Sequence, residues 1–390
     1  MVQQVLVVGA GIGGVAAALA CARSGAQVQL FEQAEKFSEI GAGIQLGPNV
    51  VKLLERWGLA QALGAVAAFP QRLEVCDAET GRSLGQLRLG QTMVQSYGAV
   101  YATVRRSDLH DLLLSAMLAS GSVDLKLGSQ IAQVQQHEQG VLLQTRDGQQ
   151  ARGDWLMGAD GVRSRVRELM LNDGECRASG HLAYRALVQQ SSLPAAMRSQ
   201  QVTLWLGTRL HWVQSPVRGG DWLNLALLVE GQTDPGSELW DHSASADELR
   251  GVLDLCCSPL QDLAQAVPHW ARWSLLDRSP LSGPHEMAQG RLALLGDAAH
   301  PMLPYLAQGA GMALEDADAL GQLMREPAVR GPELLQRYAQ QRWQRNARVQ
   351  HRAIRNAGVF HADGVLRWGR NMAMRLLGER LLDQPWLYRT

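Results

Sequence analysis

The chain has 390 residues, 46% of them hydrophobic and 19% charged, which is typical of a folded enzyme with more than one lobe. Its 37 basic and 37 acidic residues balance, so no net charge favours nucleic acid or an anionic membrane as a partner. The five cysteines form no CxxC pair, which argues against a disulfide framework and leads us to expect a cytoplasmic protein with free thiols.

The first fifty residues predict a strand, a glycine-rich turn, a helix and a second strand. Residues 4–8 form an apolar, β-branched run, followed by GAGIGG and then by the helix-forming run VAAALACARS. A second strand over residues 27–31 ends at Glu32. Glycines interrupt the apolar stretch 5–22 and no basic segment precedes it, so we interpret it neither as a signal peptide nor as a membrane span.

This order of elements is typical of a dinucleotide-binding βαβ unit. Gly9 allows the tight turn, Gly11 lets the backbone approach a pyrophosphate, and Gly14 lets the helix pack closely on the strand. The helix N-terminus offers N–H groups to the phosphates, and Glu32 can accept a hydrogen bond from a ribose 2′-OH. An acid at position 32 argues against a 2′-phosphate, so the site takes FAD or NAD.

Two further turns of glycine and aspartate follow predicted strands. In GDWLMGADGVRSRVR, residues 153–167, a strand leads to Asp160 and Gly161 and then to a basic helix start. In GRLALLGDAAHPMLPYLAQGAGM, residues 290–312, a strand stops at Gly296-Asp297 and a helix begins near Gly311. The loop between them is rich in Gly, Pro and Ala, and we interpret it as the seat of a flat, polar-edged cofactor.

The intervening segments predict a second lobe with a sheet. Residues 72–89 alternate like two strands joined by a turn at residues 79–82, and several strand-like runs recur between residues 180 and 230. Residues 247–257 and 260–266 read as helices. The tail, residues 334–357 and 365–382, predicts two helices, the first carrying many arginines.

Together, GAGIGG with Glu32, ADGVRS with Arg167, and LLGDAAHP resemble the group A FAD-dependent aromatic hydroxylases. The resemblance implies an α/β fold in which a Rossmann-like FAD-binding domain is interrupted by a β-sheet substrate domain and followed by C-terminal helices. We expect the FAD-binding domain over residues 1–71, 101–178 and 286–345, the substrate domain over residues 72–100 and 179–285, and the C-terminal helices over residues 346–390.

The resemblance also implies which residues bind the cofactor. Asp160 and Gly161 would lie where FAD and the passing nicotinamide cofactor both make contact, and Asp297 would bind the ribityl chain. Arg106, at the start of a predicted helix, matches the flavin-contacting arginine of the family, although the neighbouring Arg105 could be aligned instead. The residues that would meet the isoalloxazine ring through their backbone are Pro301, Gly309, Ala310, Gly311 and Met312.

In the family, NADH or NADPH reduces FAD, O₂ adds to give a flavin C4a-hydroperoxide, and a phenolic aromatic ring is hydroxylated. A base near the phenol raises the nucleophilicity of the ring. His211, in the strand-like segment LHWVQSPV, matches the histidine of the 3-hydroxybenzoate and 6-hydroxynicotinate hydroxylases, and its ordinary pKa near 6.5 suits a base. A lone histidine on an apolar strand is otherwise more often a core residue.

The sequence departs from parts of this branch. Ser215 stands where 3-hydroxybenzoate 6-hydroxylases have tyrosine, and Pro304 stands where they have glutamine. The Pro304 loop resembles that of salicylate 1-monooxygenases and 6-hydroxynicotinate 3-monooxygenases, but Tyr305 stands where the hydroxynicotinate enzymes tend to have histidine. The resemblance therefore points to conversion of salicylate to catechol with loss of CO₂. The 3-hydroxybenzoate and 6-hydroxynicotinate reactions are the alternatives.

The predicted substrate site contains a cation and aromatic walls. Arg185 could bind a substrate carboxylate, and Tyr184 and Trp205 could stack on the ring, although aromatic strand residues are usually core. Pro304 and Tyr305 complete the set. We expect a small aromatic substrate and O₂ as partners, with no metal, nucleic acid or membrane. A homodimer, a non-hydroxylating flavin oxidoreductase and a dinucleotide-binding protein remain open.

Overall fold

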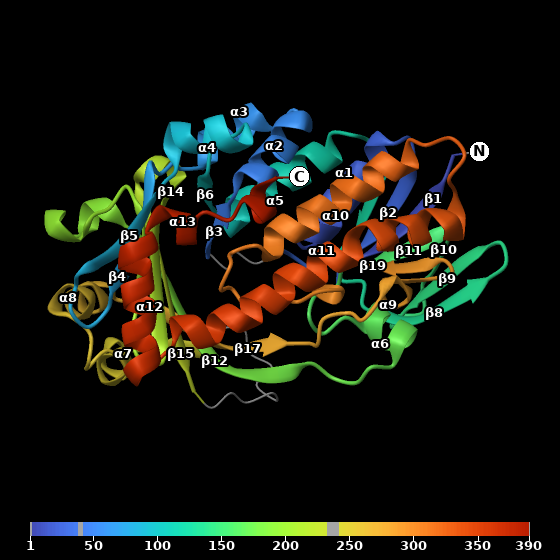
Figure 1. The fold of residues 1–390 in the computed structure, drawn as a ribbon. Helices are drawn as coiled ribbons and strands as arrows, with labels where there is room; N and C mark the ends of the chain where they lie inside the picture. Colours follow the sequence, from blue (N-terminus) through green and yellow to red (C-terminus); the bar gives the residue numbers. More distant parts are fainter. Residues whose placement is uncertain (1, 38–41, 232–241, 390) are drawn as a thin grey trace. The chain divides into compact units, whose positions relative to one another are not determined.

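The computed structural model describes residues 2–37, 42–231 and 242–389, and the chain forms two compact units (Figure 1). The first unit comprises residues 1–39, 109–177 and 277–353. The second comprises residues 40–108, 178–276 and 354–390. Each unit is therefore assembled from segments that are far apart in the sequence.

The first unit is built on a mostly parallel sheet with the strand order β18-β19-β11-β1-β2-β7. Strands β19, β11, β1, β2 and β7 are parallel, and only β18 at the edge is antiparallel. The strands are β1 (Gln4–Val8), β2 (Gln27–Phe31), β7 (Val123–Lys126), β11 (Trp155–Gly158), β18 (Ala288–Gln289) and β19 (Leu292–Leu294). The predicted strands at residues 4–8 and 27–31 are confirmed to the residue.

Two helices of the first unit pack closely because the residues between them are small. Helix α1 (Ile12–Arg23) is buried over most of its length, and α10 (Gly309–Met324) packs against it. A Cβ at Gly13 would lie 3.3 Å from Ala313 Cβ, and one at Gly321 would lie 3.1 Å from Ala20 Cβ. The other helices here are α5 (Arg106–Leu118), α6 (Arg165–Leu171), α9 (Pro284–Met287) and most of α11 (Gly331–Phe360).

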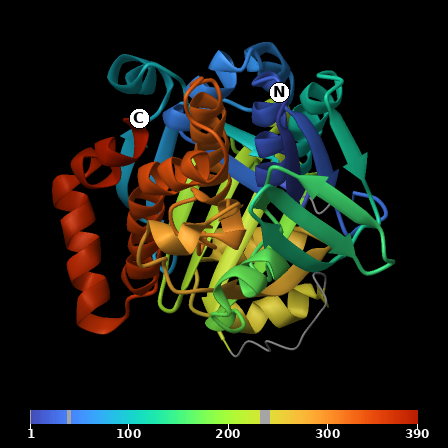
Figure 2. The ribbon, with the colours of Figure 1, turned by 90° about the vertical axis from the view of Figure 1, so that its right-hand side faces the viewer.

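A small antiparallel sheet also belongs to the first unit (Figure 2). It consists of β8 (Ile131–His137), β9 (Gly140–Thr145) and β10 (Gln150–Gly153), in the order β10-β9-β8. Gly153 ends β10 beside Leu6 of β1, where a Cβ would lie 2.7 Å from Leu6 Cγ.

The second unit is built on a long mixed sheet with the order β16-β17-β12-β15-β14-β13-β4-β5. Its strands are β4 (Arg72–Asp77), β5 (Ser83–Arg88), β12 (Arg177–Gln189), β13 (Val202–Leu206), β14 (Leu210–Val217), β15 (Trp222–Glu230), β16 (His242–Ala244) and β17 (Trp270–Asp277). A two-stranded sheet pairs β3 (Gly43–Leu46) with β6 (Ala102–Arg105). The strands predicted between residues 180 and 230 are present.

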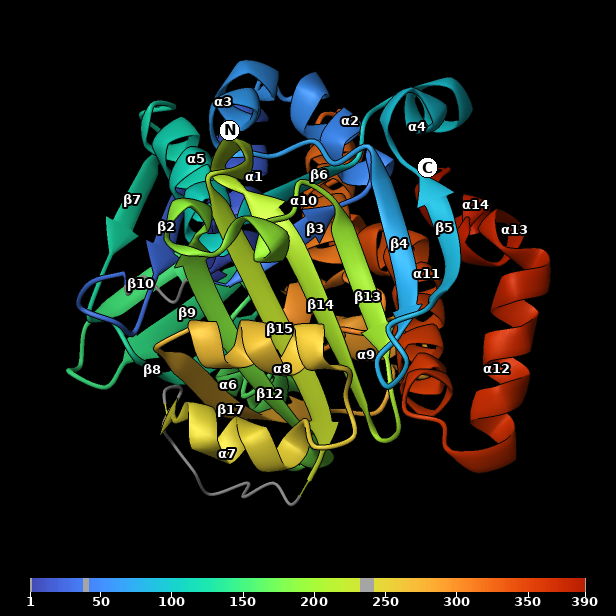
Figure 3. The ribbon, with the colours of Figure 1, turned by 90° about the vertical axis from the view of Figure 1, so that its left-hand side faces the viewer.

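One face of the long sheet is covered by α7 (Ala246–Val252) and α8 (Ser258–Ala266), which cross β12, β15 and β14 (Figure 3). Their apolar residues join the sheet in one core that includes Trp212, Leu227, Leu249 and Leu263. Helix α7 ends at Val252, earlier than the predicted end at residue 257. The remaining helices before the tail are α2 (Pro48–Arg56), α3 (Ala60–Val66) and α4 (Gly90–Tyr97).

The tail packs on the second unit. Helix α11 extends to Phe360, and α12 (Gly364–Leu377), α13 (Glu379–Leu382) and α14 (Pro385–Tyr388) follow. Met374 of α12 is buried with Val75, Leu84 and Leu206 of the long sheet. The helix predicted over residues 365–382 is interrupted at Gly378, whose φ of 48° lies in the left-handed region.

The compact units divide the chain by packing, whereas the domain boundaries expected from the sequence divide it by function. Residues 40–71, expected in the FAD-binding domain, pack in the second unit, and residues 354–390 pack there too. The functional division stays a prediction. No helix in the described ranges has both the length and the apolar character that a membrane span needs.

Candidate active site

The glycine-rich turn between β1 and α1 has the geometry that the sequence predicts. Gly9 has φ of 93°, and a Cβ there would lie 2.5 Å from the carbonyl oxygen of Ala159. A Cβ at Gly14 would lie 1.7 Å from the carbonyl oxygen of Gly9. A Cβ at Gly11, by contrast, would lie within 4 Å of none of the described residues beyond its two chain neighbours, so the space beside Gly11 is open to a ligand.

Glu32, at the end of β2, is held in position by main-chain donors. Its Oε2 accepts a hydrogen bond from the N–H of Ala10 at 2.8 Å, and its Oε1 accepts one from the N–H of Ala34 at 2.9 Å. The carboxylate is thereby fixed beside the glycine turn. Each oxygen retains a lone pair, so a ribose hydroxyl can still donate to it.

The ADGVRS segment forms a capped turn. The Asp160 carboxylate accepts hydrogen bonds from Ser164 Oγ at 2.5 Å and from the N–H groups of Arg165 and Val166 at 2.7 and 3.1 Å. These bonds place a negative charge at the start of α6. Burial raises the pKa of Asp160, and the same hydrogen bonds oppose that rise. Gly161, with φ of 80°, completes the turn.

Arg167 joins two of the sequence motifs. It is 2% exposed, and its Nη1 donates hydrogen bonds to the carbonyl oxygens of Ala298 and Ala299 at 3.1 and 2.9 Å. Its Nη2 also forms an ion pair with Asp173 at 2.7 Å. The ADGVRS turn and the GDAAHP loop are therefore fastened together by one buried guanidinium.

The loop between β19 and α10, which the sequence predicts to bind a flat cofactor, contains one exposed acidic side chain and leads to a helix N-terminus without a side-chain cap. Asp297 is exposed although its neighbours Gly296 and Ala298 are buried. Its Oδ1 lies 3.9 Å from where a Cβ at Gly309 would be, close to the N-terminus of α10. No side chain caps that N-terminus, so its first N–H groups can bind the polar edge of a ligand.

A buried polar network that the sequence did not reveal supports this loop. His300 Nε2 lies 2.6 Å from Asp316 Oδ2, and Asp316 also accepts hydrogen bonds from Arg342 and Asn346 at 2.7 and 2.9 Å. Gln350 Nε2 donates to the carbonyl oxygen of Pro301 at 2.9 Å. The partners come from α10 and α11, so spacing along the sequence gave no signal for the network.

In the second unit, His211 lies on β14 and is 1% exposed. Its cross-strand neighbours are Leu206 and Leu228. Because side chains alternate along a strand, His211 faces away from the core that contains its neighbour Trp212. Burial first, and the charge of His361 next, lower the pKa of His211 well below 6.5, so its imidazole is neutral at physiological pH.

Arg185 shares this face of the sheet. Arg185 of β12 pairs with Ala226 of β15, which pairs in turn with Val213 of β14, two residues after His211. The Nε of Arg185 is shielded from solvent and has no hydrogen-bond partner among the residues that the structure describes. Burial and then the charge of Arg106 lower the pKa of Arg185 to about 10.

Tyr184 and Trp205 lie on the other face. Trp205 pairs with Trp212, and Tyr184 and Trp212 both pair with Leu227, so all of them belong to the core under α7 and α8. Tyr184 Oη donates a hydrogen bond to Glu248 of α7 at 2.9 Å. Tyr184 and Trp205 therefore cannot stack on a substrate ring beside His211, because they lie on the opposite face of the sheet. Their role is in the core, which was the alternative expected for aromatic strand residues.

The structure also places the three other predicted site residues, Arg106, Pro304 and Tyr305. The N–H of Arg106, at the start of α5, donates to the carbonyl oxygen of Ala42 at 2.7 Å, and its side chain is exposed. Tyr305 is 3% exposed and Pro304 is half-buried, in the loop that precedes α10. Their contact with a substrate stays a prediction.

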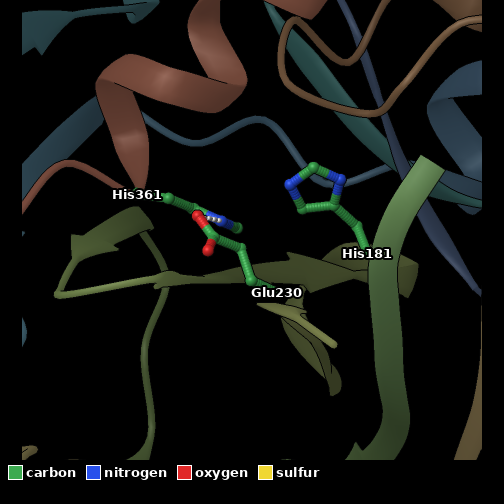
Figure 4. A group of neighbouring side chains, drawn as sticks. All are labelled: His181, Glu230 and His361. Atoms are coloured by element: carbon green, nitrogen blue, oxygen red, sulfur yellow. Dashed lines mark ion pairs between the residues drawn. The ribbon is translucent and has the colours of Figure 1, made fainter. Parts of the chain in front are cut away.

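His181, Glu230 and His361 lie together in the second unit, whereas the sequence suggested no metal-ligating cluster (Figure 4). Their potential ligand atoms lie within 4.8 Å of one another. Within this cluster, Nδ1 of His361 lies 3.6 Å from Oε1 of Glu230. In addition, Arg209 Nε already forms an ion pair with Glu230 Oε2 at 2.9 Å.

Comparisons with known proteins agree with this geometry. The model of the FAD binding domain family matches residues 2–353. A 3-hydroxybenzoate 6-hydroxylase of Polaromonas naphthalenivorans is 35% identical over 98% of this chain and 95% of its own length. A 6-hydroxynicotinate 3-monooxygenase of Pseudomonas fluorescens is 36% identical over 89% of both chains. A salicylate hydroxylase–substrate complex is 25% identical, with a TM-score of 0.83 over 99% of this chain and 95% of that one.

The first unit fits FAD on its own geometry. Gly11 leaves room for a pyrophosphate at the N-terminus of α1, while Glu32 and Asp297 offer carboxylates to hydroxyl groups. The expected α/β fold, with a Rossmann-like FAD-binding domain interrupted by a sheet, is confirmed, as are FAD and a nicotinamide cosubstrate. The chain belongs to the FAD-dependent aromatic hydroxylases, a family of monooxygenases.

Proposed function

We propose that this enzyme hydroxylates a phenolic aromatic carboxylate and that its substrate is a 3-hydroxybenzoate. The 35% identity to a 3-hydroxybenzoate 6-hydroxylase over 98% of this chain supports this substrate over salicylate, which the Pro304 loop had favoured. Ser215 and Pro304 still differ from the residues expected in that branch. The substrate therefore has to be tested against both alternatives, salicylate and 6-hydroxynicotinate.

FAD, when bound, accepts a hydride from NADH or NADPH and activates O₂ for transfer to the ring. Glu32, Asp297 and the first N–H groups of α1 and α10 would hold it. These groups surround one connected set of turns in the first unit, and Arg167 fixes two of those turns to each other. The protein's task at this site is to bind and orient the cofactor.

His211 is the base in this proposal. A neutral imidazole carries a lone pair that can accept the phenolic proton, and burial keeps His211 neutral. Removing that proton makes the ring a stronger nucleophile. Because His211 is enclosed on β14, bulk water does not compete for the same lone pair.

Arg185 is the carboxylate anchor. Its guanidinium lies on the same sheet face as His211, with Cζ 4.8 Å from the centroid of the Trp273 ring, and no acid of the described chain pairs with it. A second cation, Arg106, already lowers its pKa, so an incoming carboxylate would relieve repulsion as well as form hydrogen bonds. A base and a cation that has no acidic partner among the described residues lie on one sheet face, and this observation carries the proposal.

The test is a comparison of substrates with the FAD-loaded enzyme. NADH and NADPH oxidation are measured with 3-hydroxybenzoate, salicylate and 6-hydroxynicotinate, together with the hydroxylated product and peroxide. We expect 3-hydroxybenzoate to stimulate oxidation with product formed and little peroxide. Coupled turnover with salicylate alone, releasing CO₂, would restore the salicylate assignment.

A variant tests the base. His211→Gln should retain FAD and lower the hydroxylation rate about a hundredfold or more, in the range of general base catalysis. Arg250→Gln serves as the matched control, because Arg250 is an exposed residue of α7 that forms a surface ion pair with Asp247. Unchanged coupled turnover in His211→Gln would remove His211 from the mechanism.

A further inference from the structure

His211 also contacts a residue outside the sheet. Its Nδ1 forms a hydrogen bond of 2.8 Å with Nε2 of His361, which follows α11 and is 150 residues away in the sequence. The opposite nitrogen of His361, Nδ1, lies 3.6 Å from Oε1 of Glu230, at the end of β15 (Figure 4). Two imidazoles and a carboxylate thus form one row.

Exposure rises along this row. The side chains of His211 and His361 are almost fully buried, whereas that of Glu230 is 34% exposed. The Phe360 ring packs edge-on against His211 with 5.3 Å between ring centroids. The row therefore leads from a shielded imidazole to a carboxylate in contact with solvent.

Among the residues that the structure describes, three other ionisable groups face the row. His181 of β12 packs on His361 with ring centroids 5.3 Å apart, and its Nδ1 lies 3.0 Å from the carbonyl oxygen of Ser179. Arg209 pairs with Glu230 Oε2 at 2.9 Å. Arg370 of α12 donates to the carbonyl oxygen of Phe360 at 2.6 Å. Both arginines are cationic neighbours that disfavour a second positive charge on the histidines.

Resting on the proposed function, we infer that His361 and Glu230 carry the substrate's phenolic proton from His211 to solvent. The O–H bond of the phenol breaks as an N–H bond forms at Nε2 of His211. The proton on Nδ1 of His211 passes to Nε2 of His361, and the proton on Nδ1 of His361 passes to the Glu230 carboxylate. A rotation of the exposed Glu230 side chain closes the final 3.6 Å, and no electrons are transferred.

A relay explains how such a buried histidine can act as a base. Burial and the neighbouring His181 lower the pKa of His361 to about 3, and the pKa of His211 is lowered too. Neither imidazole can store a positive charge in this environment. A proton that arrives on one nitrogen must therefore leave from the other, and the 2.8 Å hydrogen bond provides the path.

The first test uses the FAD-loaded enzyme and the substrate that wild type hydroxylates in the panel. His361→Phe removes both ring nitrogens, and Glu230→Gln keeps the shape but removes the proton acceptor. We expect both variants to bind FAD normally and to lower coupled hydroxylation about tenfold or more, with more peroxide per NADH consumed. Added imidazole should restore part of the His361→Gly rate, which a purely structural loss would not allow.

His269→Gln is the matched control, since His269 is an exposed histidine of the same unit, between α8 and β17, and is not part of the row. It should stay within about twofold of wild type in coupling. Loss of coupling in His211→Gln with wild-type coupling in both His361→Phe and Glu230→Gln would overturn the relay and leave the proposed function standing. Zinc bound stoichiometrically, with activity raised on its removal, would overturn it in favour of a metal site.

A second measurement needs no turnover and decides the relay even if no substrate of the panel is hydroxylated. Nitrogen-15 NMR of the histidine rings in the FAD-loaded enzyme reports which ring nitrogen carries the proton. The relay requires Nδ1–H on both His211 and His361. A proton on Nε2 of His211 would leave it no lone pair for the phenol and would contradict the relay directly.

Discussion

Two glycines of the first turn serve different purposes, one in the fold and one in ligand binding. Gly11 has an ordinary extended conformation, with φ of −70°, and a Cβ there would lie more than 4 Å from the described residues other than its chain neighbours. Gly11→Ala should therefore leave the stability of the FAD-free protein unchanged. It should weaken FAD binding about tenfold or more, because a displaced phosphate loses hydrogen bonds worth about 1.5–3 kcal/mol. Flavin fluorescence titration measures the affinity.

Gly14→Ala is the control for that substitution. Its Cβ would overlap the carbonyl oxygen of Gly9 at 1.7 Å, so the helix would have to move. We expect a loss of stability of about 1–3 kcal/mol or more with or without FAD. Equal effects of the two variants on the FAD-free protein would contradict the assignment of open space beside Gly11.

If Arg185 binds the substrate carboxylate, its removal should weaken substrate binding. Arg185→Met should raise KM about ten- to a hundredfold for a carboxylate substrate, because charge-assisted hydrogen bonds contribute about 1.5–3 kcal/mol. It should change kcat less, since the anchor does not touch the reacting hydroxyl in our proposal. Arg272→Met is the comparison, because Arg272 already pairs with Glu248 at 2.6 Å. A KM that is unchanged in Arg185→Met would exclude the anchor.

At the scale of elements, the sequence predicted what local spacing determines. Strand periodicity located β1, β2 and most strands of the long sheet, and the glycine turns located the cofactor loops. Alternation along a strand already places the adjacent residues Tyr184 and Arg185 on opposite faces. Which of these two faces His211 shares depends on the pairing and register of β12, β15 and β14, which local spacing does not give. His361 and Asp316 could not be recognised either, because their partners lie on distant elements and follow no spacing rule.

The network that joins α10, α11 and the loop at His300 should contribute to the stability of the folded protein. Asp316→Asn should cost about 1.5–3 kcal/mol at pH 7, because a neutral amide weakens the charge-assisted hydrogen bonds at this position, although Arg342 keeps its ion pair with Glu315 at 3.0 Å. Asp318→Asn, two residues along α10, is the control, since Asp318 is half-buried and accepts from the exposed Gln322. Urea unfolding measures both variants, and equal losses would contradict a special role for Asp316.

The same network makes stability depend on pH with a definite sign. Burial alone would raise the pKa of Asp316, but His300 and Arg342 outweigh it and lower the pKa from 3.8 to about 2. A lowered pKa in the folded state means that this contribution is present above pH 3.8 and is lost as the pH falls towards 2. We expect the stability difference between wild type and Asp316→Asn to narrow over that acid range.

At the scale of the whole molecule, the match to the FAD binding domain family ends at residue 353, where the first unit ends and the tail of the second begins. The tail nevertheless completes the core of the second unit. Met374 is 5% exposed and packs with Val75, Leu84 and Leu206, and the proposed proton relay also takes His361 from this segment. Residues beyond the family match thus contribute both to packing and to the proposed chemistry.

Met374→Ala should therefore destabilise the protein by about 2–5 kcal/mol, through lost apolar burial and the cavity left behind. Arg375→Ala, at the adjacent exposed position of α12, should stay within about 0.5 kcal/mol of wild type. Urea unfolding followed by far-ultraviolet circular dichroism and by flavin fluorescence compares the two variants. If Met374→Ala proved as stable as Arg375→Ala, the packing of α12 on the long sheet would not contribute to stability. That packing would then not fix the position of His361.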